Sequence, residues 1–422
     1  MERLIIFTSH YPFGAGEPFL EEEIRIAESC FNEITIVTYA KSNEALTRYI
    51  PKNAKVIHLR KDSKHTGKFA KGSGLLKSLL RITTWKEIGN GIKERGFNQL
   101  ITIIKSILLF ERHIDSIKRE QAVWMNSDPC QTVFYSYWLN AAAVYLSRID
   151  RPNDVRICRA HGGDCFFDRE YVPWRKDVLK RIDKVFTVSA GGKDDLTSHY
   201  KKHVDHIEKK IDVARLGVNI PEKNTAAATS DGEAVIVSCS NMIPLKRLDL
   251  LINALADESV RHHIRWVHFG DGPQLEEILS LANELLDHSD YVTYEFKGRT
   301  PKTEIMDFYR ENNVALFINC SDVEGIPVSI MEAMSYGIPA VARDVGSNRE
   351  IVNENCGALL PSRITPRDLA TCIDRILDVS GESMLKMRKA AIETVKKNYD
   401  CIKNYTSFFH TIEIMLREKA DE

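Results

Sequence analysis

The chain is predicted to be an α/β protein with two doubly wound parallel sheets, and three observations lead to that prediction. Short apolar runs rich in β-branched residues recur along all 422 residues, and each is followed by a longer stretch of helical periodicity. The runs are continuous rather than alternating, which is typical of strands covered by helices on both faces. A small polar segment near the middle divides the runs into two series. The length suits two or three domains of about 150 residues each.

The apolar runs are expected to form the strands of the two sheets. In the first half they are Leu4 to Thr8, Ile34 to Tyr39, Lys55 to Leu59, Thr132 to Tyr137, Val155 to Arg159, Val185 to Ser189 and Val213 to Leu216. In the second half they are Ala234 to Cys239, Ile264 to Phe269, Val292 to Phe296, Val314 to Ile318, Ala340 to Ala342 and Ala358 to Leu360.

The domain boundary is marked by a change in composition. Gly217 to Pro221 is followed by the small polar stretch Asn224 to Gly232, which can bury little and is typical of a linker. We expect a first domain over residues 1–220 and a second over residues 221–400. A helical pattern over residues 402–419 predicts a final helix in 401–422, which could pack on its own domain or return to the first.

Composition excludes several classes of protein. Lys plus Arg number 58 and Asp plus Glu 59, so the net charge of -1 gives no field that would favour nucleic acid. The nine cysteines are scattered without a Cys-x-x-Cys pair, which indicates reduced thiols in a cytosolic compartment. The first apolar run is too short for a signal peptide, and no run is long enough to span a membrane. We expect a cytoplasmic protein.

One segment, Lys52 to Lys86, departs from this neutral balance. Its ten basic residues stand against the single acid Asp62, and leucines and Trp85 are interleaved with them. A solvated loop and helix face is one interpretation. The other is a peripheral contact with an anionic lipid surface, on the inner face of the cell membrane.

The most informative motif, Ser321 to Gly337, follows the strand that ends at Ile318. Its two carboxylates, Glu324 and Glu332, stand eight residues apart and can accept hydrogen bonds from the hydroxyl groups of a sugar and a ribose. Pro327 suits the first turn of a helix. The backbone N–H groups at that helix start provide a ready site for phosphate, and they belong to Gly325, Ile326 and Val328.

Further candidate residues follow other strands of the second half. Asn241, Lys246 and Arg247 come after the strand that ends at Cys239, where the two cations are placed to meet a diphosphate. Gly270 and Gly298, the latter followed by Arg299, also come directly after strands, and a glycine there lets a ligand approach the backbone closely.

Taken together and in this order, these residues resemble the GT-B glycosyltransferases of family four, a retaining group that uses nucleotide-sugar donors. The resemblance covers about residues 1–20 and 132–400 and leaves about 41–130 unmatched. It implies two Rossmann-like domains that face a cleft. Two segments, Tyr135 to Trp138 and Arg159 to Tyr171, resemble a narrower group within the family. That group builds bacterial surface polysaccharides.

The resemblance implies a role for each matched residue of the second domain. Glu332 would bind the ribose hydroxyls, and Glu324 would bind a hydroxyl of the transferred sugar. Lys246 and Arg247 would neutralise the departing diphosphate. Gly298 and its neighbours would line the base pocket. Asn241 stands where many relatives carry Arg, and Arg247 could supply that second charge.

In the first domain the resemblance rests on two segments. Arg159 to Asp164 matches a His-Gly-x-Asp motif, whose histidine, here His161, would point at the donor sugar. Gly16 belongs to a glycine loop, Gly14 to Gly16, that would let the chain approach donor and acceptor. Glu17 is expected to cap the helix that follows.

The predicted function is therefore retaining transfer of a hexose-type sugar from a UDP- or GDP-linked donor to a saccharide or lipid-linked saccharide. No cofactor and no metal are expected, because cations already face the diphosphate and no Asp-x-Asp triplet occurs. Two alternatives remain open. One is a sugar-nucleotide epimerase or phosphorylase of the same fold, and the other is a non-catalytic sugar-binding protein.

Overall fold

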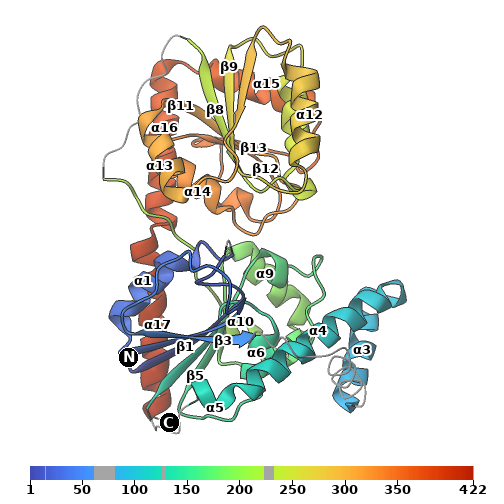
Figure 1. Ribbon diagram of the computed structural model, residues 1–422, viewed down its shortest axis with the longest axis vertical. Coiled ribbons are helices and arrows are strands. Elements are labelled where there is room, and N and C mark those ends of the chain that lie inside the picture. Colours follow the sequence, from blue (N-terminus) through green and yellow to red (C-terminus); the bar gives the residue numbers. More distant parts are fainter. Residues whose placement is uncertain (15, 61–80, 126–129, 223–231, 422) are drawn as a thin grey trace. The chain divides into compact units, whose positions relative to one another are not determined.

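The structure is a computed structural model that describes residues 1–14, 16–60, 81–125, 130–222 and 232–421. The chain forms two compact units (Figure 1). Unit 1 contains Met1–Arg215 and Tyr405–Glu422, and unit 2 contains Leu216–Asn404. Each unit is built around one sheet in which all neighbouring strands are parallel. The predicted fold class, two doubly wound parallel sheets, is thus confirmed.

The sheet of unit 1 has seven strands in the order β3-β2-β1-β4-β5-β6-β7. They are β1 (Arg3–Thr8), β2 (Glu33–Lys41), β3 (Ala54–Arg60), β4 (Thr132–Ser136), β5 (Val155–Ala160), β6 (Lys184–Thr187) and β7 (Ile211–Val213). The helices of this unit are α1 (Leu20–Cys30), α3 (Ile82–Arg95), η1 (Phe97–Gln99), α4 (Leu100–Arg119), α5 (Gln121–Trp124), α6 (Ala141–Leu146), α7 (Gly162–Cys165), α8 (Arg175–Arg181), α9 (Ala190–Tyr200) and α10 (Ile207–Lys210).

The last helix, α17 (Cys401–Asp421), joins unit 1 from Tyr405 onward. Its Phe408 ring lies 5.6 Å from the ring of Tyr135 in β4 and 4.9 Å from that of Phe186 in β6. The neighbouring residues Phe134 and Val185 point to the opposite face of the sheet, into a core shared with α4. The sheet of unit 1 is therefore covered on both faces, which explains its continuous apolar strands.

The sheet of unit 2 has six strands in the order β10-β9-β8-β11-β12-β13. They are β8 (Ala234–Cys239), β9 (Ile264–Phe269), β10 (Val292–Phe296), β11 (Val314–Asn319), β12 (Ala340–Arg343) and β13 (Gly357–Leu360). The helices are η2 (Pro244–Lys246), α11 (Leu248–Leu255), α12 (Leu275–Leu286), α13 (Lys302–Glu311), α14 (Val328–Ser335), η3 (Asn348–Glu350), α15 (Pro366–Leu377) and α16 (Gly381–Asn398). The strand order reverses between β8 and β11, which makes their carboxyl ends a topological switch point.

Each expected strand is present, but β7 is displaced from its predicted place. The sequence predicts Val213 to Leu216, whereas the strand covers Ile211–Val213. It lies at the edge of the sheet, and its central Asp212 forms an ion pair of 2.7 Å with Lys184. The charged Asp212 interrupts the apolar run, so the sequence pattern places the strand a few residues too late.

Some predicted segments lie outside the described residues. They are Ala15 of the glycine loop, residues 61–80 of the basic segment and residues 224–231 of the expected linker. Within the described ranges, no helix combines the length and the apolar character needed to cross a bilayer. All nine cysteines are free thiols.

Candidate functional site

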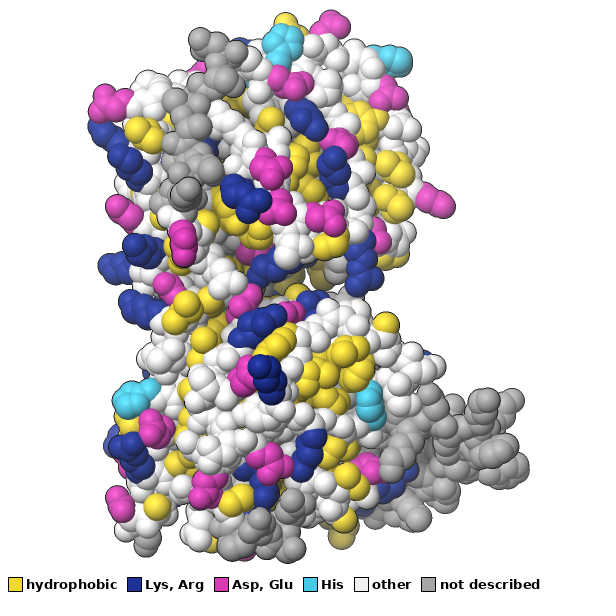
Figure 2. Space-filling model, turned by 60° about the vertical axis from the view of Figure 1, so that its left-hand side comes forward, with side chains coloured by type: hydrophobic (Ala, Val, Ile, Leu, Met, Phe, Trp, Pro, Cys, Tyr) yellow, Lys and Arg dark blue, Asp and Glu magenta, His cyan; other side chains and the backbone are white. Residues whose placement is uncertain are grey.

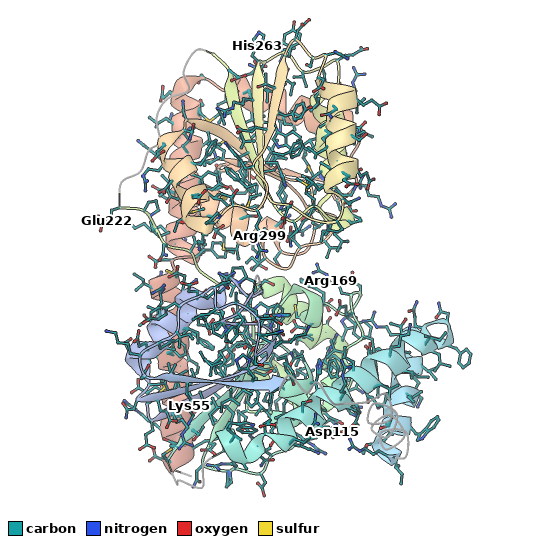
Figure 3. The ribbon with its side chains drawn as sticks, in the orientation of Figure 1. Lys55, Asp115, Arg169, Glu222, His263 and Arg299 are labelled. Atoms are coloured by element: carbon teal, nitrogen blue, oxygen red, sulfur yellow. The ribbon has the colours of Figure 1, made fainter. Side chains whose placement is uncertain are left out.

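The candidate residues of unit 2 follow the carboxyl ends of its strands. Asn241, Lys246 and Arg247 come after β8, and Glu324 comes after the neighbouring strand β11. Figure 3 shows the two ends of this sheet, because His263 directly precedes β9 and Arg299 closely follows β10. Ligands of open α/β sheets bind outside the carboxyl ends at the switch point, and this is where the chain gathers these residues.

Lys246 and Glu324 are in direct contact. The Lys246 Nζ donates to Glu324 Oε1 over 2.6 Å, although 78 residues separate them in sequence. The lysine side chain is 24% exposed and the glutamate side chain 10%. A backbone bond of 2.8 Å from Asp322 N to the Leu245 carbonyl joins the two loops. The pair therefore belongs to a fixed loop contact that remains open to solvent on the lysine side.

Two short polar side chains hold the Glu324 carboxylate in place. Ser321 Oγ donates to Glu324 Oε1 over 2.6 Å, and Asn319 Nδ2 donates to the same oxygen over 3.2 Å. Asn319 is the last residue of β11, so the strand itself sets the position of the carboxylate. Glu324 would thus keep two donors if Lys246 were to turn toward another anion.

Arg247 is engaged by acidic neighbours. Its backbone is left-handed, with φ of 51°, and its guanidinium contacts Asp249 through Nε at 3.0 Å and Nη2 at 3.0 Å. Its Nη1 lies 3.4 Å from Asp322, which also binds Arg343. The hydrogen bonds to Asp249 raise the pKa of Arg247. Its positive charge lies beside these carboxylates, and its expected role at a diphosphate stays a prediction.

Glu332 lies on α14 and forms an ion pair with Lys302, the first residue of α13. The Lys302 Nζ is 3.0 Å from Glu332 Oε1, and the glutamate side chain is 16% exposed. Lys302 is not predictable from the sequence, since it is 30 residues away from Glu332 and stands in no recognisable motif. Only the packing of the β10 and β11 crossovers brings it to Glu332.

The helix start near the two glutamates is as open as expected. Helix α14 begins at Val328, with Pro327 just before it. The N–H groups of Gly325, Ile326 and Val328 make no hydrogen bond within the described part of the chain, while the Gly325 carbonyl accepts from Ser347 N over 3.1 Å. Unpaired donors at a helix start suit an anion.

The glycine turns after β9 and β10 meet one another. Gly270 N donates to the Gly298 carbonyl over 2.9 Å. Gly270 has φ of 137°, and a Cβ built there would lie 1.9 Å from the Ser240 carbonyl oxygen, so only glycine fits. Asn241 and Arg299 are exposed on the loops that follow β8 and β10.

In unit 1, His161 follows β5 inside an aromatic cluster. Its ring lies 4.3 Å from that of Trp138, 4.9 Å from Tyr137 and 5.5 Å from Phe19. Both ring nitrogens are buried without a hydrogen bond. Burial, together with the charge of Arg159, lowers the pKa of His161 well below its usual range. The imidazole is therefore neutral at neutral pH.

Two carboxylates of unit 1 are bound by backbone N–H groups. Asp164 accepts from the N–H groups of Leu139, over 2.7 Å, and of His161, and burial raises its pKa to about 7. Glu17 accepts from the N–H groups of residues 9, 10 and 11. The expectation that Glu17 caps the following helix is wrong. Its left-handed backbone, with φ of 53°, turns the carboxylate back to the end of β1, and the helix starts only at Leu20.

A buried ion pair lies beneath these loops. Arg159 Nη1 is 2.7 Å from Glu23 Oε2, and both side chains have no exposed surface. Tyr135 donates to the other oxygen of Glu23 over 2.8 Å. The guanidinium lies 4.4 Å above the ring of Phe408 in α17. The pair joins α1, β4, β5 and α17.

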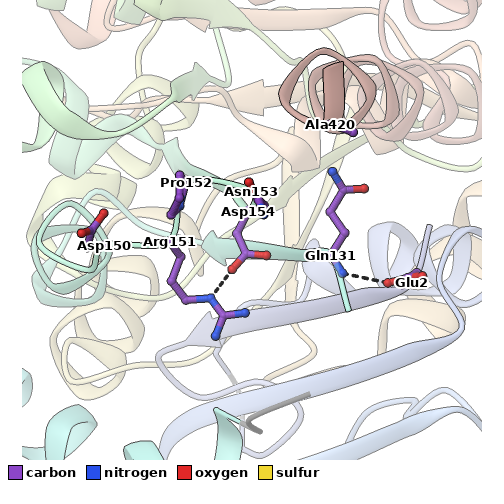
Figure 4. A pocket seen from close by; sticks show the side chains of 8 residues that line it. All are labelled: Glu2, Gln131, Asp150, Arg151, Pro152, Asn153, Asp154 and Ala420. Carbon is purple, nitrogen blue, oxygen red and sulfur yellow. Dashed lines mark hydrogen bonds and ion pairs between the residues drawn. The ribbon is translucent and has the colours of Figure 1, made fainter. Parts of the chain in front are cut away.

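A polar hollow of about 680 Å³ lies at the other end of the unit 1 sheet (Figure 4). It is lined by residues that precede β1, β4 and β5, including Glu2, Gln131 and Asp154. Arg151 pairs with Asp154, and Gln131 N donates to Glu2 over 2.7 Å. Because it lies at the amino ends of the strands, the hollow is not part of the candidate site. Among the described side chains, no cluster of His, Cys, Asp or Glu is arranged to hold a metal ion.

The comparisons with known proteins agree with this arrangement. Residues 219–397 match the family model of the glycosyl transferases group 1. The GDP-mannose-dependent alpha-(1-6)-phosphatidylinositol monomannoside mannosyltransferase of Mycobacterium tuberculosis is 29% identical over 38% of this chain and 40% of its own length. The O-antigen biosynthesis glycosyltransferase WbnH of Escherichia coli is 30% identical over 40% of this chain and 43% of its own.

Similarity to solved structures extends over the whole chain. The sucrose-phosphate synthase of Thermosynechococcus elongatus has a TM-score of 0.68 at 14% identity, with 99% of this chain and 100% of that chain covered. In sequence, the chain spans about half the length of the first curated relatives it matches. The family match identifies residues 219–397 as a domain of the glycosyl transferases group 1 family, which is consistent with the resemblance in sequence.

Proposed function

We propose that the protein is a retaining glycosyltransferase of the family-four type. It would transfer a hexose-type sugar from a UDP- or GDP-linked donor to a saccharide or lipid-linked saccharide during the synthesis of a surface polysaccharide. One observation carries the proposal: the contact of Lys246 with Glu324 at the switch point of a group 1 domain. This contact places a cation that can bind phosphate beside a carboxylate that can accept a hydrogen bond from a sugar hydroxyl. A sugar diphosphate requires both groups.

The proposed donor contacts follow from this geometry. Lys246 would exchange Glu324 for the diphosphate, since Glu324 retains Asn319 and Ser321 as donors. The N–H groups before and at the start of α14 would bind the same anion. Glu332 would accept the ribose hydroxyls. These groups would neutralise the leaving group without a metal ion. Arg247 would contribute mainly by holding the loops together through Asp249 and Asp322.

The proposed reaction forms one bond and breaks one. The acceptor hydroxyl oxygen attacks the anomeric carbon on the face that the diphosphate leaves. The bond from that carbon to the diphosphate oxygen breaks, and the hydroxyl proton passes to the departing phosphate. Negative charge grows on the diphosphate, so a cation fixed beside it stabilises the transition state most. Neutral His161 is proposed to hydrogen-bond the transferred sugar.

The acceptor and the place of the reaction are parts of the same proposal. Several relatives, including an amylovoran and an O-antigen glycosyltransferase, are named for surface polysaccharides. One relative is named for GDP-mannose, and the proposal keeps both UDP and GDP donors. We place the enzyme in the cytoplasm, with the basic segment Lys52 to Lys86 as a first candidate for lipid contact. Its residues 61–80 lie outside the described part of the chain.

A donor screen tests the proposal. The purified protein is incubated with UDP- and GDP-hexoses and with simple or lipid-linked saccharides, and products are identified by mass. We expect one hexose added to the acceptor and release of the nucleoside diphosphate, with the anomeric configuration retained by NMR. Thermal shift with UDP and GDP gives an independent measure of binding, because a ligand of the folded state raises the midpoint.

The same experiment separates the alternatives. An epimerase would change the donor without an acceptor, and a phosphorylase would need inorganic phosphate. A non-catalytic sugar-binding protein would ignore both nucleotides. The proposal is wrong if Glu332→Ala and Lys246→Ala variants keep wild-type donor binding and transfer.

A further inference from the structure

Helices α3 and α4 of unit 1 carry an outward face on which basic and apolar side chains alternate. On α4, Ile101, Lys105 and Leu109 are exposed and spaced four residues apart, so they share one side of the helix. Helix α3 has a similar side. We call the two together the α3–α4 stripe, which consists of Ile82, Trp85, Lys86 and Lys93 on α3 and Ile101, Lys105, Leu109 and Arg112 on α4.

The opposite sides of these helices are firmly packed. Ile103, Ile107 and Ile114 of α4 are fully buried in the core of unit 1. A Cβ at Gly91 of α3 would lie 2.6 Å from Ile103 Cγ2, so the two helices touch closely. In Figure 1, α3 and α4 extend to the side of unit 1 away from α1 and α17. The stripe is thus the solvent-exposed side of a helix pair that is packed into the core of unit 1.

The exposed charges of this helix pair have a single sign. Residues 82–124 are all described, and their exposed charged residues are Lys86, Lys93, Lys105, Arg112, Lys118 and Arg119. The acids of the same range are buried or half-buried, and the chain itself binds them. Glu87 accepts from Tyr171 over 2.8 Å, and Glu111 pairs with Arg81. On the face shown in Figure 2, in contrast, basic and acidic side chains are interspersed.

The apolar members of the stripe are unusually open to solvent. Ile82 is 86% exposed, Ile101 69% and Trp85 61%, and Phe97 between the helices is 72% exposed. Scattered apolar residues are normal on a protein surface, but a group of them on one helix pair marks a binding surface. Large apolar side chains mixed with cations suit the boundary between headgroups and acyl chains of anionic lipids.

We propose that the α3–α4 stripe binds the surface of an anionic lipid bilayer, with Ile82, Trp85, Phe97 and Ile101 inserted between headgroups and the basic residues against their phosphates. This surface shares Ile82, Trp85 and Lys86 with the basic segment Lys52 to Lys86 named in the sequence and adds the outward side of α4. The inference deepens the proposed function, because a lipid-linked acceptor resides at such a surface. The test measures binding to lipid vesicles in the absence of sugar transfer. The lipid-binding inference and the proposed function can therefore fail independently.

Vesicle flotation of the full chain tests the proposal. Vesicles contain either phosphatidylcholine alone or phosphatidylcholine with about one third phosphatidylglycerol. We expect binding to the anionic vesicles that falls steeply between low salt and about 0.5 M NaCl, where exposed charges are screened. The fluorescence of Trp85 should shift to shorter wavelength on binding, and a Trp85→Phe variant identifies that part of the signal.

Variants locate the surface. The double variant Lys105→Glu, Arg112→Glu should weaken partitioning at least about tenfold, because each basic side chain near the lipid contributes and each reversal also repels. Ile101→Ser should weaken binding to the anionic vesicles but leave the salt dependence of that binding unchanged. The control Lys386→Glu, Lys389→Glu reverses two exposed lysines of α16 and should bind like the wild type. Circular dichroism verifies that each variant is folded.

Three results would overturn the proposal. Equal binding to neutral and anionic vesicles would show that charge plays no part. An equal loss in the control and stripe variants would show that the stripe is not the contact. Absence of binding by the wild type at low salt would leave the stripe to another kind of partner, such as an acidic protein.

Discussion

Each unit of the molecule holds one ion pair of nearly the same length beside its candidate residues, yet the two pairs differ in their surroundings. Arg159 and Glu23 in unit 1 are 2.7 Å apart and fully buried. Lys246 and Glu324 in unit 2 are 2.6 Å apart, and the lysine side chain is 24% exposed. The distance between the two charged atoms alone therefore does not reveal the role of an ion pair.

The surroundings suggest what each pair can do. Arg159 is enclosed by Tyr137, Tyr405 and Phe408, so no ligand can reach it without unfolding the neighbourhood. Lys246 has a flexible side chain at the open end of a sheet, where an anion can replace its carboxylate. We infer that the first pair fixes the loops that carry His161 and Glu17, and that the second is an exchangeable binding group.

The largest effect is expected from breaking the buried pair. Arg159→Met leaves the Glu23 charge buried without its partner, which should lower the free energy of unfolding by about 3–5 kcal/mol. Urea unfolding followed by circular dichroism measures this. Adding Glu23→Gln should recover much of the loss, because the lone charge is then removed and Tyr135 keeps an acceptor. A double variant no more stable than Arg159→Met would contradict the structural role.

Breaking the exchangeable pair of Lys246 and Glu324 should lower activity and leave stability nearly unchanged. Lys246→Met should reduce kcat for sugar transfer by about 100- to 1000-fold, the usual cost of losing one charge-stabilising group in the transition state. Its unfolding free energy should change by about 1 kcal/mol or less, since the pair is partly exposed. Lys386→Met removes the lysine of an exposed pair with Glu382 and serves as control. A stable variant with full activity would refute exchange at Lys246.

A third prediction concerns the backbone-bound carboxylate Asp164. Burial raises its pKa to about 7, so its contribution to stability is complete below its unfolded pKa and is lost as the pH rises through about 7. The unfolding free energy of the wild type, relative to Asp164→Asn, should therefore fall between pH 5 and pH 8. Urea unfolding at several pH values measures this difference.

The exposed carboxylate Asp368 offers a matched control for that measurement. It also accepts a backbone N–H, that of Thr365, and this bond lowers its pKa. Its contribution to stability is lost only as the pH falls through that lowered pKa. The wild type relative to Asp368→Asn should therefore show no change between pH 5 and pH 8. The same slope at both positions would exclude burial as the cause.

The smallest effect is expected at the half-exposed pair of Lys302 and Glu332. Lys302→Met should raise the KM for the donor by less than about fivefold and leave kcat unchanged, because a partly exposed pair contributes little and only orients Glu332. Steady-state kinetics with varied donor separates the two constants. A fall in kcat at constant KM would mean that Lys302 acts in the transition state instead.

Most of the fold follows from the sequence because parallel strands covered on both faces produce long apolar runs. The exception, β7, shows the limit of this reasoning. Its central residue is the charged Asp212, which interrupts the apolar run and shifts the predicted bounds. The return of α17 to unit 1 was an open alternative, because helical periodicity shows that a face is buried but not what buries it.

The candidate site could be predicted where its residues lie close to strand ends and only in part elsewhere. Glu324, Glu332 and Lys246 stand in local motifs and are found at the switch point. Lys302 and Asp249 were missed, because ion pairs between loops depend on packing that no spacing reveals. Glu17 was assigned to the wrong partner, because its left-handed backbone reverses the direction of the side chain.

The division of the chain has a consequence for how such proteins diversify. Unit 1 is discontinuous in sequence: Tyr405, Phe408 and Phe409 belong to it although nearly two hundred residues of unit 2 precede them. A recombination event that exchanges only the amino-terminal half would leave the sheet of unit 1 with a foreign helix against Arg159. Exchange of amino-terminal halves between relatives should therefore succeed only when the terminal helix is exchanged with them.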